Sequence, residues 1–282
     1  MNWMMIDPLL LRALKEDLGS GDVTTDGVVM AGRMCRGRFI AKEDGVVCGL
    51  AVAQRVFFHV SRLGGEDAGI VMDLQVDEGA PVSKGDILAT IHGPAAPILS
   101  GERVALNFLQ HLSGIATRTA LAVAAVQGTK ARIADTRKTT PGLRWLEKYA
   151  VRTGGGANHR LNLSDGILIK DNHIVAAGGI GSAVAAVRKY APHTLRVEVE
   201  VENLAQVDEA LAAGAEILLL DNMGTDLLRA AVERVAGRAL TEASGNMGDR
   251  DLREVAATGV DYISIGALTH SVRALDISLR FE

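Results

Sequence analysis

The segment that decides the fold is Leu195–Asn222, which reads LRVEVEVENLAQVDEALAAGAEILLLDN. Leu195–Val201 is a short run rich in β-branched residues, and Glu216–Asp221 is a second short run rich in leucine and isoleucine. The residues between these two runs are rich in alanine and have the apolar spacing of a helix. The segment therefore predicts a strand–helix–strand unit, the building block of a parallel sheet.

The same alternation continues on both sides of this segment. We predict further strands at Ala131–Asp135, Gly166–Lys170, Arg238–Glu242 and Asp261–Ile265, with helical patterns between them. Repeated βα units of this kind indicate an α/β fold. A complete β/α barrel has eight strands, so six visible strands indicate either an incomplete barrel or two strands that the pattern does not reveal.

The residues before about position 112 have a different character. Short β-like runs separated by glycine occur at Cys35–Lys42, Val46–Cys48, Ile70–Val76 and Ile87–Ile91. These runs predict a small mixed α/β domain with antiparallel features, and a length of 282 residues suits roughly two domains. A long helical pattern from Ser100 joins the two parts, so we expect domains at residues 1–112 and 113–282.

Two local patterns in the first part carry further expectations. Asp7-Pro8, followed by apolar residues, predicts a capped amphipathic helix that ends at Gly19. The segment Asp77–Asp86 resembles the turn-rich hammerhead of biotinyl and lipoyl carrier domains. A carrier also needs a lysine for modification in a characteristic short motif at a hairpin tip, and the sequence has no such motif.

Composition excludes several classes of protein. With 48% hydrophobic residues, 23% charged residues and a net charge of -4, the chain is expected to be globular rather than disordered. This charge balance, together with 4% aromatic residues, argues against a general nucleic-acid binder. The only cysteines, Cys35 and Cys48, form no disulfide framework or zinc motif. With no cleavage site in Met1–Leu18 and no apolar run long enough to cross a bilayer, we expect a cytoplasmic protein without membrane association.

Polar residues gather at the ends of the predicted strands. The carboxyl ends of barrel strands share one face, so these groups should converge on one site. Residues 130–170 carry nine basic and three acidic residues, a balance of +6, whereas residues 195–226 carry one arginine and eight acids, a balance of -7. One side of the site should therefore bind anions, and the other side suits a metal ion.

On the basic side, Arg137, Lys138, Arg160 and Lys170 lie at strand ends or in the glycine-rich loop 154–160. Guanidinium groups in such positions can grip carboxylates with two hydrogen bonds. His159 is expected to contact an anion as a neutral imidazole, because the basic loop would lower its pKa.

On the acidic side, Glu200 and Asp221 each close a strand. Carboxylates from two adjacent strands suit Mg²⁺ that shares oxygens with a phosphate-bearing ligand, although an ion pair with the basic side is the alternative. Glycines at the ends of the last two strands let backbone N–H groups approach a phosphate. The residues expected there are Ser244, Gly245, Asn246, Ile265, Gly266 and Ala267.

Several motifs, in order and nearly from end to end of the chain, resemble the quinolinate phosphoribosyltransferase family. They are Glu16–Thr25, Glu102–Asn107, Asp135–Gly142, Gly154–Arg160 with Ile169–His173, and Glu242–Asn246. The resemblance implies an N-terminal α/β sandwich joined to an incomplete, six-stranded α/β barrel, with the C-terminal tail packing back on the N-terminal domain. It also implies a homodimer, or a higher oligomer, whose site takes residues from both chains.

The resemblance further implies that quinolinate and 5-phosphoribosyl 1-diphosphate react, with Mg²⁺, to give nicotinate mononucleotide, CO₂ and diphosphate in NAD biosynthesis. By resemblance, the quinolinate site consists of Thr136, Arg137, Lys138, His159, Arg160 and the partner chain's Arg103. Lys170, Glu200 and Asp221 match positions at the phosphoribosyl substrate, the two acids close to its hydroxyls and Mg²⁺, while the two glycine loops match its 5′-phosphate site. Lys138, Lys170, Glu200 and Asp221 are the expected catalytic residues.

Three alternatives remain at this point. The chain could be a related phosphoribosyltransferase that acts on another acid, since fold alone cannot separate the two. It could be a biotinyl or lipoyl carrier, or a ligand-binding protein without turnover. Each alternative makes a different prediction for activity with quinolinate.

Overall fold

The computed structural model describes residues 1–282 and divides into two compact units. The N-terminal unit consists of Met1–Ala120, Pro141–Gly154 and Val272–Glu282, and the barrel unit consists of Leu121–Thr140 and Gly155–Ser271. None of the helices combines the length and apolar character needed to cross a bilayer.

The barrel unit is built on one parallel sheet of six strands, as the sequence predicted. The strands are β6 (Arg132–Ala134), β7 (Ile167–Ile169), β8 (Val197–Val201), β9 (Ile217–Asp221), β10 (Leu240–Ser244) and β11 (Tyr262–Ser264). Their order in the sheet is β6-β11-β10-β9-β8-β7, so β6 and β7 are its two edges. Because these edges do not pair with each other, the sheet is an incomplete barrel, and the two further strands of a full barrel are absent.

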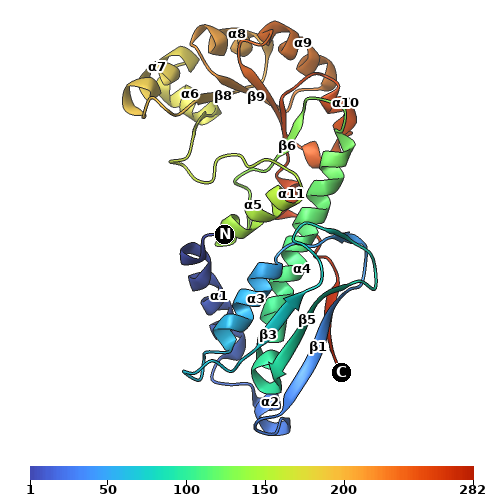
Figure 1. Ribbon diagram of the computed structural model, residues 1–282. Helices are drawn as coiled ribbons and strands as arrows, with labels where there is room; N and C mark the ends of the chain where they lie inside the picture. The colour runs from blue at the N-terminus through green and yellow to red at the C-terminus, as the bar shows by residue number, and fades with distance from the viewer. The chain divides into compact units, whose positions relative to one another are not determined.

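Helices follow the strands of the barrel unit, and Figure 1 shows α7, α8 and α9 along the outer side of the sheet. The helices are α6 (Asp171–Ala177), α7 (Ile180–Tyr190), α8 (Leu204–Ala212), α9 (Thr225–Val235), α10 (Leu252–Ala256) and α11 (Ala267–His270), with a 3₁₀ turn at Met247–Asp249. In α9 the buried residues Leu228, Ala231 and Val235 recur every three to four positions, which places them on one face. The helices thus cover the outside of the sheet and leave the strand ends open.

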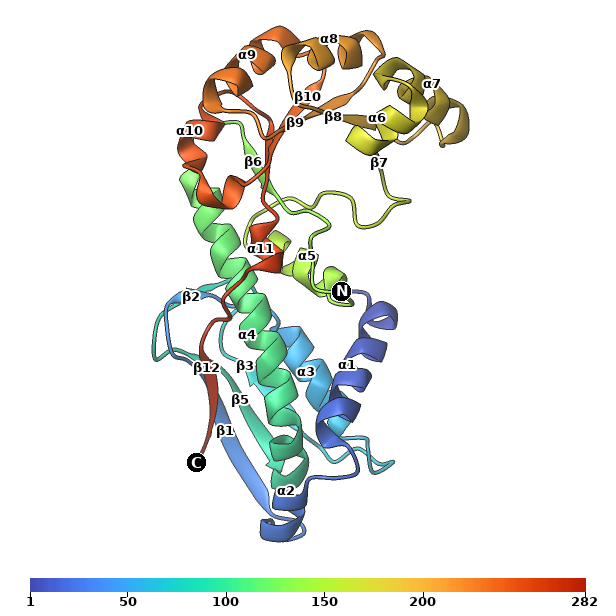
Figure 2. The same ribbon diagram turned by 180° about the vertical axis from the view of Figure 1, so that it is seen from behind.

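The N-terminal unit contains a four-stranded antiparallel sheet in the order β12-β1-β5-β3. Figure 2 shows β12, from the end of the chain, beside β1. The strands are β1 (Met34–Ala41), β3 (Val71–Leu74), β5 (Ile87–Pro94) and β12 (Ile277–Phe281), and β2 (Gly45–Val46) pairs separately with β4 (Pro81–Val82). The helices are α1 (Trp3–Leu18), α2 (Val23–Val28), α3 (Leu50–Val60), α4 (Ala95–Ala125) and α5 (Arg144–Thr153).

The predicted first helix is right at its end and wrong at its start. It ends before Gly19, but it begins at Trp3, so Asp7 is not its cap and Pro8 lies inside the helix. The Asp7 carboxylate instead accepts hydrogen bonds from Arg55 Nε at 2.8 Å and Nη2 at 2.5 Å. Asp7 therefore forms a long-range ion pair with Arg55 instead of the helix cap that the local pattern predicted.

Helix α3 was not predicted, and its beginning shows why. Its N-cap residue, Gly49, has no side chain to cap the helix. Glu78, far along the chain, accepts the backbone N–H of Gly49 and that of Leu50, the latter at 3.0 Å. A cap supplied from a distant segment leaves no local start signal in the sequence.

The division of the sequence into two domains near residue 112 stays a prediction. That position falls within α4, a single helix from Ala95 to Ala125. The compact N-terminal unit also takes in Pro141–Gly154 and Val272–Glu282, both from beyond the boundary.

Candidate active site

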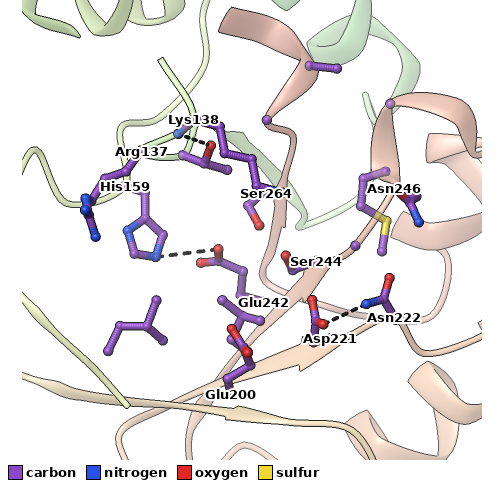
Figure 3. A pocket seen from close by; sticks show the side chains of 18 of the residues that line it. Arg137, Lys138, His159, Glu200, Asp221, Asn222, Glu242, Ser244, Asn246 and Ser264 are labelled. Carbon is purple, nitrogen blue, oxygen red and sulfur yellow. Dashed lines mark hydrogen bonds and ion pairs between the residues drawn. The ribbon is translucent and has the colours of Figure 1, made fainter. Parts of the chain in front are cut away.

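A cavity of about 610 Å³ opens in the barrel unit at the carboxyl ends of the strands (Figure 3). It is lined by most of the residues that the sequence singled out: Thr136, Arg137, Lys138, His159, Arg160, Lys170, Glu200, Asp221, Ser244, Gly245, Asn246, Gly266 and Ala267. Ile265 is 3% exposed and does not line the cavity. Arg103 is an exposed residue of α4 in the N-terminal unit and is also not part of the lining.

Arg137, Lys138 and Arg160 form the cationic part of this cavity. Arg160 Nη1 donates to the carbonyl oxygen of Gly166 at 2.9 Å, which fixes the direction of the guanidinium. Burial, and then the positive charge of Arg137, lower the pKa of Arg160. Two guanidinium groups that repel each other in a partly buried pocket provide a site for an anion.

Loop 155–160 is placed by a buried carboxylate. Asp135 follows β6 and is fully buried. It accepts hydrogen bonds from Asn158 Nδ2 at 2.6 Å and from the backbone N–H of His159 at 2.8 Å. In addition, Ala157 forms a parallel bridge with Ala134 of β6, so the loop carries His159 and Arg160 to the edge of the sheet.

The acidic residues Glu200 and Asp221 reach the cavity from β8 and β9. Glu200 forms an ion pair with Lys170 Nζ, which is the alternative that the sequence left open for it. Asp221 Oδ2 accepts a hydrogen bond from Asn222 Nδ2 at 2.7 Å. This donor set, two carboxylates at neighbouring strand ends, has the hard oxygen chemistry that Mg²⁺ prefers.

Asn222 is a pocket residue that the sequence analysis did not single out. Its backbone is left-handed, with φ +53, and its N–H donates to the carbonyl of Ser244 at 3.0 Å. A Cβ atom on Gly245, which has φ +91, would lie 2.2 Å from Asn222 Oδ1. Glycine at 245 therefore leaves room for the Asn222 amide that holds Asp221.

Glu242 lies at the floor of the site, with Glu198 buried near it, and the role of both was also missed. Glu198 and Glu242 are 4% and 5% exposed, and Glu242 lines the cavity. A signal was present, because Glu198 and Glu200 are two residues apart on β8 and so share a face of the sheet with each other. Burial, followed by the negative charge of Glu198, raises the pKa of Glu242 to about 7.

His159 lies against these glutamates. Its Nε2 is 3.1 Å from Glu198 Oε2 and 3.7 Å from Glu242 Oε1. Its Nδ1 accepts the backbone N–H of Arg160 at 2.7 Å, which leaves Nε2 directed at the two carboxylates. The neutral form of this histidine, expected from the charge of the loop, stays a prediction.

Comparison with known proteins identifies the family of the chain. The chain matches the family descriptions "Quinolinate phosphoribosyl transferase, N-terminal domain" over residues 22–113 and "Quinolinate phosphoribosyl transferase, C-terminal domain" over residues 115–280. A carboxylating nicotinate-nucleotide pyrophosphorylase of Mycobacterium leprae is 48% identical, over 95% of this chain and 94% of that protein. A decarboxylating quinolinate phosphoribosyltransferase of Nicotiana tabacum is 43% identical, over 96% of this chain and 80% of that protein.

The fold agrees with these matches. The solved structure of the nicotinate-nucleotide pyrophosphorylase from Francisella tularensis superimposes with a TM-score of 0.94 at 36% identity, covering all of this chain and 98% of that one. The matches to both family domains, to relatives by sequence and to a solved structure thus agree on one family. The chain is a member of the quinolinate phosphoribosyl transferase family.

Proposed function

We propose that this chain transfers the phosphoribosyl group of 5-phosphoribosyl 1-diphosphate to quinolinate, with loss of CO₂, to give nicotinate mononucleotide and diphosphate in NAD biosynthesis. The observation that carries this proposal is one cavity that places Arg137, Lys138 and Arg160 together with Glu200 and Asp221. A dicarboxylate acceptor suits the first group, and a polyhydroxylated phosphate donor suits the second.

The cationic residues bind the acceptor in this proposal. Quinolinate carries two carboxylates, and Arg137 and Arg160 each offer a planar set of donors that fits a carboxylate. Lys138 adds a compact positive charge beside them. Holding the pyridine nitrogen in line with the ribosyl carbon is the main contribution of these side chains, because positioning lowers the barrier of a reaction between two substrates.

The donor occupies the opposite side of the cavity in this proposal. Lys170, Glu200 and Asp221 bind the ribose hydroxyls and diphosphate, while Ser244–Asn246, Gly266 and Ala267 receive the 5′-phosphate through backbone N–H groups. Ile265 belongs only to the strand end before this loop, because its N–H donates to the carbonyl of Ala134 at 2.9 Å. Glu200 and Asp221 would hold Mg²⁺, which when bound supplies positive charge to the departing diphosphate. Asn222 keeps the Asp221 carboxylate in place through its amide.

Decarboxylation then needs little from the protein. When the ribosyl carbon has bonded to the ring nitrogen, that nitrogen is positively charged and can accommodate the electron pair left when CO₂ departs. The cationic side chains hold the carboxylate, and the cavity keeps water away from the reacting carbon. No covalent bond to the protein is required.

The proposal includes a homodimer in the cytoplasm in which each site is completed by the partner chain. Arg103 is exposed on α4 and is available to contribute its guanidinium to a second copy. Arg103→Ala should then lower activity as Arg137→Ala does. Mixing inactive Arg103→Ala chains with inactive Arg137→Ala chains should restore part of the activity, because one site per mixed dimer is intact.

The test is a direct assay for nicotinate mononucleotide and CO₂ from quinolinate and 5-phosphoribosyl 1-diphosphate, with and without Mg²⁺. Nicotinate serves as the control acceptor, since it lacks the carboxylate that leaves. Product from quinolinate alone supports the proposal. Binding of the phosphoribosyl donor without product from quinolinate would move the function to another acid or to ligand binding.

A further inference from the structure

Two neighbouring loops of the cavity carry residues that the proposed reaction assigns to the phosphoribosyl donor. The β9 loop, residues 221–225, begins with Asp221, and the β10 loop, residues 244–251, begins with Ser244–Asn246. The ribose hydroxyls and the 5′-phosphate belong to one small molecule, so its covalent structure fixes the distance between them. The two loops can bind both groups at once only if the spacing between the loops is also fixed.

The first contact between the loops lies directly after the strands. The N–H of Asn222 donates to the carbonyl of Ser244 at 3.0 Å, next to the paired residues Asp221 and Ser244. Gly245 has no side chain between the loops, and a Cβ atom there would lie 2.8 Å from the backbone nitrogen of Asn222. Figure 3 shows Asn222 beside Asp221, with Ser244 on the neighbouring strand. The beginnings of the two loops are therefore in direct contact.

The second contact is made by Arg250, a half-buried residue that does not line the cavity. Its side chain extends from the β10 loop to the β9 loop. Nη1 donates to the carbonyl of Met223 at 2.8 Å, and Nη2 donates to Thr225 Oγ1 at 3.1 Å. Both acceptors are neutral, so the guanidinium fixes the position of the β9 loop rather than balancing a charge.

The chemistry of arginine suits this contact. Its planar guanidinium presents two donors in a fixed geometry, whereas lysine has one nitrogen on a flexible chain and cannot reproduce this double contact. Met223 directly follows Asn222, whose amide donates to Asp221 Oδ2 at 2.7 Å. A shift of the Met223 carbonyl would therefore also move the amide that holds the Asp221 carboxylate.

We propose that Arg250 is a positioning residue that holds the β9 loop against the β10 loop and so sets the distance between Asp221 and the 5′-phosphate site. This inference rests on the proposed function for the identity of the donor. The two loops are then ordered when the chain folds rather than when the donor binds, which strengthens donor binding. The acceptor side of the cavity, with Arg137, Lys138 and Arg160, does not depend on this contact.

The first test separates the KM values of the two substrates. Arg250→Lys keeps the charge but loses the double contact, so the KM for 5-phosphoribosyl 1-diphosphate should rise about tenfold. The KM for quinolinate should stay within about twofold of wild type. Arg229→Lys is the matched control, because Arg229 of α9 pairs only at the surface, with Asp226 at 3.0 Å. It should leave both KM values unchanged.

A second substitution removes one acceptor and keeps the arginine. Thr225→Val has nearly the same shape but lacks Oγ1, so the KM for the donor should rise about threefold. Arg250→Lys combined with Thr225→Val should have the same KM as Arg250→Lys alone, because both changes remove the same hydrogen bond. Effects that multiply in the double variant would show that the two residues act separately and would overturn the proposal.

Two further results in Arg250→Lys would also overturn it. One is an equal rise of both KM values, which is expected of a merely structural residue. The other is an unchanged KM for the donor in a chain whose thermal unfolding shows that it is folded. If Arg250→Lys does not fold, Thr225→Val carries the same comparison of the two KM values.

Hydrogen exchange, followed by mass spectrometry on the full chain without substrates, tests the contact independently of activity. Arg250→Lys should speed exchange about tenfold in both loops, at residues 222–225 and 244–249, and leave β8 unchanged. Faster exchange in the β10 loop alone, or throughout the barrel unit, would overturn the proposal. If wild type makes no nicotinate mononucleotide but this exchange pattern is found, the proposed function fails and the contact between the loops stands.

Discussion

Two clusters of histidine and carboxylate, one in each compact unit, differ in their balance of charge. In the N-terminal unit, the single carboxylate of Asp7 contacts both Arg55 and His59. His59 Nε2 lies 3.0 Å from Asp7 Oδ1. In the barrel unit, His159 faces two carboxyl groups, Glu198 and Glu242.

The pKa values move in opposite directions as a result. The hydrogen bonds from Arg55 are the largest cause that lowers the pKa of Asp7, to about 2. Burial and the charge of Glu198 raise the pKa of Glu242 to about 7. A carboxyl therefore keeps its charge to low pH beside a guanidinium, whereas burial next to a second carboxyl favours its protonated form.

The largest expected effect comes from removing a cation of the pocket. Arg137→Ala should remove contacts to a substrate carboxylate and cost about 2 to 4 kcal/mol of transition-state binding, read as kcat/KM for quinolinate. Arg55→Ala removes a cation of the other cluster and serves as the control. It should lower the melting temperature and leave kcat/KM unchanged. Near-normal turnover by Arg137→Ala would remove this residue from the acceptor site.

The next effect concerns the pH dependence of stability. The pKa of Glu242 is raised in the folded state to about 7 from an ordinary 4.5. Its contribution to stability is therefore fully present below pH 4.5 and is lost as the pH rises through about 7, by roughly 3 kcal/mol. Glu242→Gln should remove this loss. Urea unfolding of wild type and variant from pH 5 to pH 8 measures it, and parallel curves would contradict the assignment.

A smaller effect is expected at the loop beside Asp221. Gly245→Ala places a Cβ atom 2.2 Å from Asn222 Oδ1 at a backbone position with φ +91. Strain of this kind costs about 1 to 3 kcal/mol, and relief requires Asn222 to release Asp221. We expect the KM for 5-phosphoribosyl 1-diphosphate to rise, with Gly224→Ala, where a Cβ would meet nothing within 4 Å, as the control. Equal kinetics in the two variants would show that the Asn222 amide is not needed.

The smallest effect belongs to the cluster in the N-terminal unit. The pKa of Asp7 is lowered, so its contribution to stability is present above about pH 4 and is lost as the pH falls through 2. Because the pair is partly exposed, Asp7→Asn should cost only about 1 kcal/mol at pH 7. Chemical denaturation measures this cost, and a change in the pH dependence of kcat would argue against a purely structural cluster.

The parallel sheet could be predicted because its signal is local. Each strand of the barrel unit is short, rich in β-branched residues or leucine, and ends in polar residues, and parallel strands bring those ends to one edge. This rule alone predicts one site for Arg137, Lys170, Glu200 and Asp221, and all four line the same cavity.

The remaining features depend on contacts between distant parts of the chain. Glu198 looks like a solvent-facing residue of an alternating strand, yet it is buried in the folded sheet. Its spacing from Glu200 showed only that the two share a face. The cap of α3 comes from Glu78, and the orientation of the His159 ring depends on the turn that aims the N–H of Arg160 at Nδ1. Neither spacing nor composition predicts these last two contacts.

The pairing of β12 with β1 has a consequence for how the chain folds during synthesis. Ala41, at the end of β1, pairs with Ile277, at the start of β12. At about 5 to 20 residues per second, a ribosome takes roughly 10 to 50 s to make the chain between them. During this time β5 can already pair with β1, but the opposite edge of β1 stays unpaired and is exposed to other nascent chains. The whole barrel unit is synthesised before β12, the last strand of the N-terminal sheet. The N-terminal unit is therefore the first to begin synthesis and the last to complete its fold.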